Sequence, residues 1–513
     1  MQDNATRRIE ELLDFAVRKE LIEREDRLYF CNLLMDAMHM EAPEEFEEGE
    51  PLASETMTEV LNALAEIAVN KGIAEDSEGE KTLFTRRLAG IVTPPPEAVR
   101  RKFEHLYKNE GPKAATDWFY EMCRACDYIR VDDVAKNLRF LQHTGAGELE
   151  ITINLSKPEK DPKDIAKLAE RSAAAPAYPA CQLCPENVGY AGRLDFPARQ
   201  NHRMVPMELA GETWHLQYSP YVYYNEHCIA LSDEHRNMRI SHETFVRLFE
   251  FLKLFPHYFI GSNADLPIVG GSILNHDHFQ GGRYTFPIDA AKPWIPLSYK
   301  DAAVSASVID WPMSCILLEG EEPEALIRAA DEMLEAWRAH SDPALEILSE
   351  TDGTPHNTIT PILRRNGDTW LLRLVLRNNR RSQEHPLGIF HPHAQLHHIK
   401  KENIGLIEVM GLFILPGRLL SELSIAEKYL TGECDIQKAP DADDPVAKHY
   451  AWVCDIASRV GTRLSSEEAR SAIYAALGET CEQVLKDAGV YKKDESGREG
   501  ILRFLRGIGY KEA

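Results

Sequence analysis

The stretch Gly270-Gly-Ser-Ile-Leu-Asn-His-Asp-His-Phe-Gln-Gly-Gly282 decides how the rest of the chain is understood. It places His276, His278 and Gln280 at alternate positions. Because alternate side chains of a strand point to one face, a strand here would line up two imidazoles and an amide about 7 Å apart. The paired glycines suit a backbone that a bulky group approaches closely. This combination predicts chemistry on an anion such as a phosphate.

Histidine is a suitable nucleophile for phosphorus. A neutral imidazole needs no prior deprotonation near neutral pH. One ring nitrogen attacks, and the other must donate a hydrogen bond to a fixed acceptor. Donors are also needed on the phosphoryl oxygens, and Gln280 can supply one. The alternative is that both histidines are core residues bonded to the backbone; their spacing between double glycines favours the catalytic interpretation.

Size and composition are those of an ordinary globular protein. The chain has 513 residues, 44% hydrophobic and 27% charged, enough for two to four domains. Its net charge of −24 argues against a general nucleic-acid binder, which would present basic surface to phosphates. It contains no run of about 18 uncharged apolar residues, so no membrane span is expected. The N-terminal stretch is acidic and has no signal-peptide core, which predicts a cytoplasmic protein. The ten cysteines are scattered, which predicts reduced thiols.

Hydrophobic periodicity predicts a helical region, two sheet blocks and a second helical region. Helical spacing dominates the first 150 residues, where Thr56 and Glu59 form a candidate capping box. The opening stretch is expected to continue as a strand through Phe286, and helices follow Pro416. Two similar sheet blocks indicate an internal duplication. The expected strands are 149–155, 213–218, 227–231, 359–363 and 370–376, the last two joined by an Asn-Gly hairpin, and further helices are expected over 241–255 and 322–339.

The residues around the central histidines resemble a known family. The stretch Asp265–Gly282 is similar to the active-site signature of the second class of galactose-1-phosphate uridylyltransferases, which belong to the histidine-triad superfamily. Asn275 departs from the small residue usual before the first histidine, so the local hydrogen bonding is expected to differ. The resemblance also covers Leu13–Leu34, Tyr128–Asn137, Pro197–Arg203, Tyr218–Asn225, Phe255–Asn263, Leu374–Asn379 and His391–Leu415.

The resemblance implies uridylyl transfer by double displacement, a step of Leloir galactose metabolism. His278 would attack the α-phosphorus of UDP-glucose, release glucose 1-phosphate and carry the uridylyl group. Galactose 1-phosphate would then take that group and leave as UDP-galactose. Gln280 stands where hydrolases of the superfamily have a third histidine, and an amide holds phosphoryl oxygens without the acid–base help that speeds hydrolysis. No organic cofactor is expected.

Cys181 and Cys184 form half of a candidate zinc site. A Cys-x-x-Cys pair in a Pro-flanked loop suits tetrahedral zinc but needs two further ligands. The first class of the family supplies them from a histidine after a strand and from the first histidine of the motif, which correspond here to His235 and His276. The resemblance therefore implies a structural zinc that fixes the strand carrying His278. The alternative is a pair of reduced, packed cysteines.

A second His-x-His-x-Gln pattern competes for the role of nucleophile. His391, His393 and Gln395 repeat the spacing, with a central proline as in the first class of the family. The fuller signature around His278, and the cysteine pair ahead of it, favour the first copy. The second block is then expected to contribute contacts to the sugar phosphate.

Predicted substrate contacts are spread over both blocks. By resemblance, the segment 197–203 lies where the superfamily holds the base and ribose, and its donors suit uracil and phosphate oxygens. A basic turn in the second block suits a phosphate and sugar hydroxyls, with a solvated turn as the alternative. The predicted contacts are Arg199, Asn201, Arg203, Asn275, Asn378, Lys400, Lys401 and Asn403.

These features together predict an α+β protein with duplicated histidine-triad-like antiparallel sheet units. Its segments are a helical region over 1–145, a first unit with the nucleophile over 146–300, a second unit over 301–416 and a helical region over 417–513. Expected partners are a UDP-sugar, a hexose 1-phosphate and, by resemblance, a second copy in a homodimer; nucleic acid and membrane are not expected. The alternatives are a related nucleotidyltransferase or dinucleoside-polyphosphate phosphorylase, or a catalytically silent nucleotide- or zinc-binding regulator.

Overall fold

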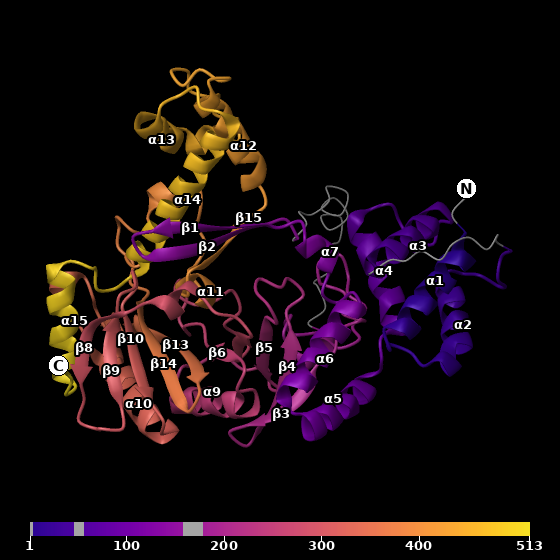
Figure 1. Cartoon of the computed structure of the whole chain (residues 1–513), viewed down its shortest axis with the longest axis horizontal. Helices are drawn as coiled ribbons and strands as arrows, with labels where there is room; N and C mark the ends of the chain where they lie inside the picture. The colour runs from indigo at the N-terminus through magenta and orange to yellow at the C-terminus, as the bar shows by residue number, and fades with distance from the viewer. Residues whose placement is uncertain (1–3, 46–55, 157–177) are drawn as a thin grey trace. The chain divides into compact units, whose positions relative to one another are not determined.

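Helices and antiparallel strands share the chain, which confirms the predicted α+β class (Figure 1). The computed structural model describes residues 4–45, 56–156 and 178–513. The chain forms two units, each assembled from several stretches. Unit 1 takes residues 1–136, 156–236 and 276–278, and unit 2 takes 137–155, 237–275 and 279–513. The division into four successive segments stays a prediction.

Unit 1 packs helices against a small antiparallel sheet. Its elements are α1 (Ala5–Arg18), α2 (Arg27–Ala37), α3 (Thr58–Asn70), α4 (Glu78–Val92), α5 (Pro96–Glu110), α6 (Pro112–Ala125), α7 (Val131–Val134), β3 (Val205–Leu209), β4 (Glu212–Tyr218) and β5 (Cys228–Ser232). The strands lie in the order β5-β4-β3. α6 packs on β4, since the rings of Phe119 and Tyr218 lie 5.2 Å apart and the Tyr218 hydroxyl donates to the Thr116 carbonyl. This sheet positions the residues of the candidate site.

Unit 2 holds the larger sheet. Its strands are β1 (Leu138–Thr144), β2 (Gly147–Asn154), β6 (Phe259–Gly261), β7 (His278–Gly282, whose first residue belongs to unit 1), β8 (Pro293–Ser298), β9 (Ser305–Ile309), β10 (Cys315–Gly320), β11 (Glu350–Thr351), β12 (Thr354–Pro355), β13 (Asn357–Asn366), β14 (Thr369–Asn378), β15 (Leu412–Pro416) and β16 (Lys511–Glu512). Its helices are α9 (His242–Leu254), α10 (Pro323–Ala339), α11 (Leu406–Val409), α12 (Leu419–Thr431), α13 (Tyr450–Val460), α14 (Ser466–Ala488) and α15 (Glu495–Gly507). The main sheet has the order β16-β8-β9-β10-β14-β13-β6-β7, and β1, β2 and β15 form another.

The order of elements supports the predicted duplication. β3, β4, β5, α9, β6 and β7 follow one another along the chain, and β8, β9, β10, α10, β13 and β14 repeat that order, apart from the inserted β11–β12 hairpin. By this correspondence β14 is the counterpart of β7. The second His-x-His-x-Gln pattern therefore follows the counterpart strand and does not lie on it.

The local predictions had mixed outcomes. The predicted hairpin is confirmed, because β13 and β14 pair with Asn366 opposite Thr369 across a two-residue turn in which Gly367 has a φ of 60°. The predicted capping box is wrong. α3 begins at Thr58, and the Thr56 hydroxyl donates to Asp132 (2.7 Å) instead.

Trp337 anchors α10 to the main sheet of unit 2. Its side chain is 0% exposed, and its indole Nε1 donates to the carbonyls of Thr358 (3.0 Å) and Arg377 (3.1 Å). Substituting Trp337→Ala is expected to lower the free energy of unfolding by about 3–5 kcal/mol, as measured by urea denaturation. Val460→Ala, at a side chain 45% exposed on α13, is the matched control and should change stability by less than about 0.5 kcal/mol. Equal stability of the two variants would contradict this role.

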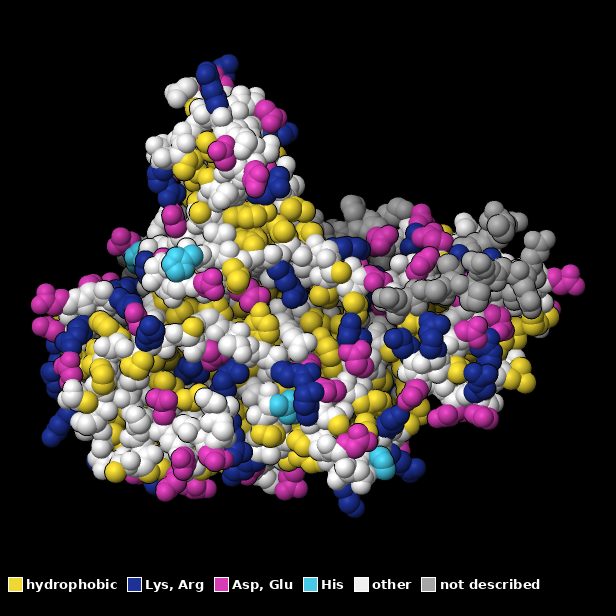
Figure 2. All heavy atoms as spheres, viewed as in Figure 1, with side chains coloured by type: hydrophobic (Ala, Val, Ile, Leu, Met, Phe, Trp, Pro, Cys, Tyr) yellow, Lys and Arg dark blue, Asp and Glu magenta, His cyan; other side chains and the backbone are white. Residues whose placement is uncertain are grey.

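The surface of the visible face is mixed in charge. Figure 2 shows basic and acidic side chains interspersed over it. The net charge of −24 is therefore not gathered into one patch on that face. Among the helices in the described ranges, none is both long and apolar enough to cross a membrane.

Candidate active site and metal site

The central motif is only partly a strand. β7 begins at His278 and ends at Gly282, so the predicted strand through Phe286 is wrong. His278 and Gln280 occupy alternate positions of β7, whereas His276 precedes it. Two backbone hydrogen bonds within unit 1 hold this entry to the strand: the Asp277 amide donates to the Arg236 carbonyl (2.7 Å), and the Ser232 amide donates to the Asp277 carbonyl (3.0 Å).

The glycines before the histidines allow a loop to pack on itself. A Cβ atom on Gly270 would lie 2.5 Å from the Ala264 carbonyl oxygen, and one on Gly271 would lie 2.7 Å from the Asn263 amide nitrogen. At Gly270 the obstacle is backbone, so that position requires glycine, whereas at Gly271 the Asn263 side chain would have to move. The contact at Gly270 is made within the loop of unit 2.

One ring nitrogen of His278 is already hydrogen-bonded to the backbone. Its Nδ1 lies 2.8 Å from the His276 carbonyl oxygen, which can only accept, so Nδ1 carries the proton and Nε2 the lone pair. The side chain is 6% exposed, and burial lowers its pKa to about 4. The ring is therefore neutral at pH 7 with Nε2 in the nucleophilic form. Gln280, two residues on, is half-buried and pairs with Gly261 of β6.

Four side chains of unit 1 converge on one point. The Cys181 sulfur lies 3.4 Å from the Cys184 sulfur and 3.3 Å from Nδ1 of His276. The Cys184 sulfur lies 3.1 Å from Nδ1 of His235 and 3.6 Å from Nδ1 of His276. These donor atoms all lie within 4.8 Å of one another. The four residues predicted as metal ligands are thus brought together.

The donor set fits zinc. Usual Zn–S and Zn–N bond lengths place tetrahedral ligand atoms about 3.4–3.8 Å apart, close to the separations seen here. Nε2 of His276 lies 2.8 Å from the Ser232 carbonyl oxygen, so Nε2 carries the proton and Nδ1 offers its lone pair to the thiols. Burial raises the pKa of Cys184 to about 12, so a thiolate pair there requires a cation beside it. Two thiols and two correctly oriented imidazoles can hold a zinc ion.

Comparison with known proteins places the chain in one family. The model of the galactose-1-phosphate uridyl transferase N-terminal domain matches residues 32–237, and that of the C-terminal domain matches 250–441. A galactose-1-phosphate uridylyltransferase of Caldanaerobacter subterraneus is 48% identical over 520 residues, which cover 100% of this chain and 99% of the relative. The chain belongs to the galactose-1-phosphate uridylyltransferase family. A galactose-1-phosphate uridylyltransferase of Bacillus subtilis is 45% identical over 98% of both chains. The crystal structure of yeast Ap4A phosphorylase Apa2 overlaps 69% of this chain and 98% of that one, with 12% identity and a TM-score of 0.30.

Within this uridylyltransferase-family chain, three supporting residues were missed from sequence. The buried Asn187 amide donates to the carbonyls of Cys181 and Cys184, both at 2.8 Å, and so fixes the cysteine turn. Nε of Arg236 lies 3.5 Å from the carboxylate of Asp277, the residue after the candidate metal ligand His276. The only sequence signal for Asn187 was its place three residues after Cys184. Nothing local in sequence paired Arg236 with Asp277.

The predicted nucleotide segment divides into structural and available groups. The Arg203 guanidinium donates to the carbonyls of Thr93, Pro94, Gln200 and His202, and the Asn201 amide donates to the Cys126 carbonyl. Both side chains are buried and tie this segment to the helices of unit 1. Arg199 instead stacks on Tyr128, its guanidinium carbon 5.6 Å from the ring centroid. Its guanidinium makes no hydrogen bond to any residue that the structure describes.

The predicted contacts in unit 2 divide in the same way. The Asn378 amide donates to the Leu348 carbonyl and the Asn357 side chain. Lys400 is 5% exposed, and its ammonium donates to Glu408 at 2.9 Å. The polar groups of both side chains are therefore occupied by hydrogen bonds within unit 2. Lys401, Asn403 and Asn275 are exposed, and the Asn403 amide donates to the Gly270 carbonyl.

The second His-x-His-x-Gln pattern lies in a loop that leads into a short 3-10 helix, Ala394–Leu396. Both ring nitrogens of His393 face acceptors, since Nε2 lies 3.1 Å from the Ile389 carbonyl and Nδ1 lies 3.6 Å from the Asp487 carboxylate. Neither nitrogen is aimed at open space. This geometry favours His278 as the nucleophile.

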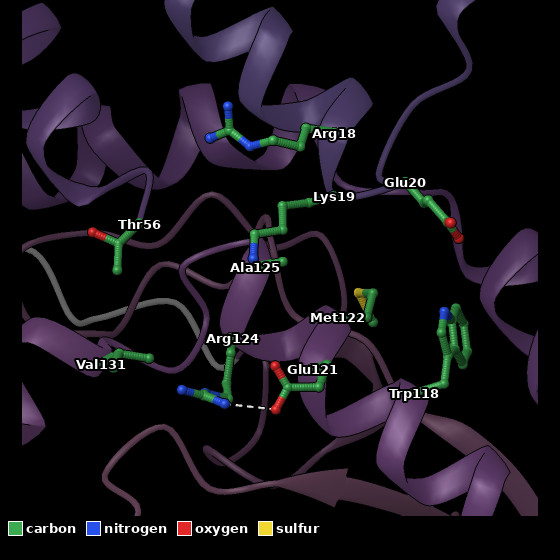
Figure 3. A pocket seen from close by; sticks show the side chains of 10 residues that line it. All are labelled: Arg18, Lys19, Glu20, Thr56, Trp118, Glu121, Met122, Arg124, Ala125 and Val131. Atoms are coloured by element: carbon green, nitrogen blue, oxygen red, sulfur yellow. Dashed lines mark hydrogen bonds and ion pairs between the residues drawn. The ribbon is translucent and has the colours of Figure 1, made fainter. Parts of the chain in front are cut away.

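A hollow of about 640 Å³ in the helical part of unit 1 involves none of these residues (Figure 3). Arg18 and Lys19 reach it from the end of α1, and Trp118 from α6. Its Arg124 is already paired with Glu121 at 2.6 Å. We assign it no part in the chemistry of the motif.

Proposed function

We propose that the protein transfers the uridylyl group of UDP-glucose to galactose 1-phosphate by double displacement through a uridylyl-histidine. The single observation that carries this proposal is the state of His278, a buried neutral ring whose Nδ1 proton is committed to the His276 carbonyl. Membership of the galactose-1-phosphate uridylyltransferase family, over nearly the full length of its relatives, supplies the substrates.

The proposed first step needs no general acid. The Nε2 lone pair of His278 forms a bond to the α-phosphorus, and the bond from that phosphorus to the bridging oxygen breaks. Glucose 1-phosphate leaves with the electron pair. The Nδ1–H bond to the His276 carbonyl stabilises the positive charge that develops on the ring. Galactose 1-phosphate then attacks the same phosphorus, the phosphorus–nitrogen bond breaks, and UDP-galactose leaves.

The amide of Gln280 is proposed to donate to the phosphoryl oxygens. It stands at the alternate position to His278 on β7 and so shares its strand face. An amide does not titrate near neutral pH, so it stabilises charge on the oxygens without activating water. The uridylyl-enzyme would in this way persist until a sugar phosphate arrives.

Zinc is proposed as a structural ion held by Cys181, Cys184, His235 and His276. When bound, it would cross-link the cysteine turn, the segment after β5 and the entry to β7. His276 holds the acceptor for His278 in its own backbone, so fixing His276 also fixes the orientation of the nucleophile.

Three exposed or available side chains are the strongest of the predicted substrate contacts. Arg199 is proposed for the nucleotide, and Lys401 and Asn403 for the sugar phosphate. The geometry of Asn201, Arg203, Asn378 and Lys400 supports a structural role for each. A homodimer and a cytoplasmic location also belong to this proposal; light scattering of the purified protein and fractionation of cells would test them.

Brief exposure to UDP-glucose labelled in the uridine tests the proposal. We expect stoichiometric labelling of the protein, release of glucose 1-phosphate, and transfer of the label to added galactose 1-phosphate. Labelling by a dinucleoside polyphosphate but not by UDP-glucose would instead support a phosphorylase. Tight binding of UDP-glucose without release of glucose 1-phosphate would support a silent regulator.

A further inference from the structure

A pocket of about 450 Å³ in unit 2 contains none of the residues given a role in the proposed chemistry. Its walls come from three places in the chain: residues 266–268 of the loop after β6, the β11–β12 hairpin with the adjoining residue 356, and residues 379–381 after β14. A volume of this size is in the usual range of small-molecule sites, about 300–1,000 Å³.

Two adjacent arginines give the pocket its charge. Arg380 donates to the Glu346 carbonyl at 2.8 Å, with the Glu346 carboxylate 4.0 Å away, so its charge is partly balanced. Arg381 is exposed, and its guanidinium has no hydrogen bond or ion pair with the rest of the described chain. In a chain of net charge −24, an arginine without an acidic partner at the edge of a pocket favours an anionic ligand.

The walls of the pocket are cross-linked before any ligand arrives. His356 is 8% exposed; its Nδ1 lies 2.8 Å from the Asn379 amide oxygen and its Nε2 lies 2.9 Å from the Thr351 hydroxyl. The Asn379 amide nitrogen also donates to the Pro267 carbonyl at 3.3 Å. Hydrogen bonds therefore join all three walls, and a preorganised site spends less of its binding energy on ordering.

The apolar wall contains a strained residue. Ile268 has a φ of +76°, a conformation that β-branched residues rarely adopt. Its side chain packs closely on Gly388, where an added Cβ atom would lie only 3.1 Å from Ile268 Cγ2. Strain that the surrounding structure maintains is concentrated at functional sites.

We propose that this pocket binds the phosphate monoester of a sugar. The Arg381 guanidinium, with Arg380 beside it, would hold the phosphate through parallel N–H bonds. The Leu266–Ile268 wall would cover the apolar face of the sugar ring, and the Thr354 hydroxyl would meet its hydroxyl groups. The inference concerns binding alone, so it stands or falls independently of uridylyl transfer.

Calorimetry with the full chain tests the site. Galactose 1-phosphate is the probe, and galactose and inorganic phosphate report on its two halves. Arg381→Gln is expected to weaken binding in the pocket at least about tenfold, because it removes a charged bidentate contact. Arg381→Lys should be intermediate, since it keeps the charge without the fork. Arg506→Gln, at an exposed position on α15, removes the same charge elsewhere and should bind as the wild type does.

Stoichiometry and kinetics show whether the ligand of this pocket is the acceptor substrate or an effector. If the pocket serves the acceptor, Arg381→Gln should also raise the KM for galactose 1-phosphate at least about tenfold while labelling by UDP-glucose is unchanged. If it serves an effector, the wild type should bind two equivalents, and Arg381→Gln should bind one with an unchanged KM. Binding by Arg381→Gln with the affinity and stoichiometry of the wild type would overturn the proposal, as would a wild-type protein that binds no phosphate monoester. Thermal melting of each variant checks that it is folded.

Discussion

Replacing His278 with asparagine is expected to lower kcat at least about 10⁴-fold and to abolish labelling by UDP-glucose. The asparagine amide can still donate to the His276 carbonyl, so the local backbone should be preserved. It has no nitrogen lone pair that can attack phosphorus, so the covalent intermediate cannot form. The measurement is rapid-quench labelling with UDP-glucose, together with steady-state rates.

His393→Asn is the matched control for this variant. His393 occupies the middle position of the second His-x-His-x-Gln pattern, and both of its ring nitrogens face other groups of unit 2. We expect UDP-glucose to label His393→Asn as it labels the wild type. Normal labelling of His278→Asn, together with no labelling of His393→Asn, would show that the nucleophile lies in the second pattern. Equal metal content in both variants would show that neither result comes from loss of the metal.

Cys184→Ser is expected to weaken zinc binding more than about 100-fold, because even partners outside the metal's immediate ligands contribute about 10–100-fold. Cys184 has the shortest contact of the cluster, 3.1 Å to His235, and also faces His276 at 3.6 Å. Without the metal, His276 would lose its tether, so kcat and the thermal midpoint should both fall. Elemental analysis of dialysed protein, and the thiolate absorption of the cobalt form, report on the site without reference to activity.

Two further variants are expected to affect zinc binding less than Cys184→Ser does. Asn187→Ala keeps all four ligands but removes the bonds to the cysteine carbonyls, and should weaken zinc binding about 10–100-fold. Cys126→Ala alters a buried thiol of unit 1 that is outside the cluster, and should retain the metal. Full metal content in Cys184→Ser would show that Cys181, His235 and His276 do not form the proposed site with it.

The proposed metal ligands and the proposed nucleophile are joined by a very short piece of chain. His276 faces the cysteines with its ring and accepts from His278 with its carbonyl. The Arg236 backbone carbonyl accepts from the Asp277 amide, and the Arg236 guanidinium lies near the Asp277 carboxylate. A change at the proposed metal site would therefore reach the proposed nucleophile through two residues and not through a distant conformational change.

Much of the fold followed from local pattern. The α10 helix and the β13–β14 hairpin lie where periodicity and the Asn-Gly pair predicted them, because their hydrogen bonds join residues close in sequence. The limits of β7 did not follow. Its entry is held by carbonyl and amide groups of Ser232 and Arg236, more than forty residues earlier in the chain, and backbone groups carry no sequence signature.

By itself, the sequence determined the family, the His-x-His-x-Gln spacing and the set of four candidate metal ligands. Only the tertiary structure decided which nitrogen of His278 is available, and which predicted contacts, such as Arg203 and Asn378, are occupied by their own unit. The physical reason is the same in each case. Residue types specify what a side chain can donate or accept, whereas the partner is often a backbone carbonyl that only folding brings within reach.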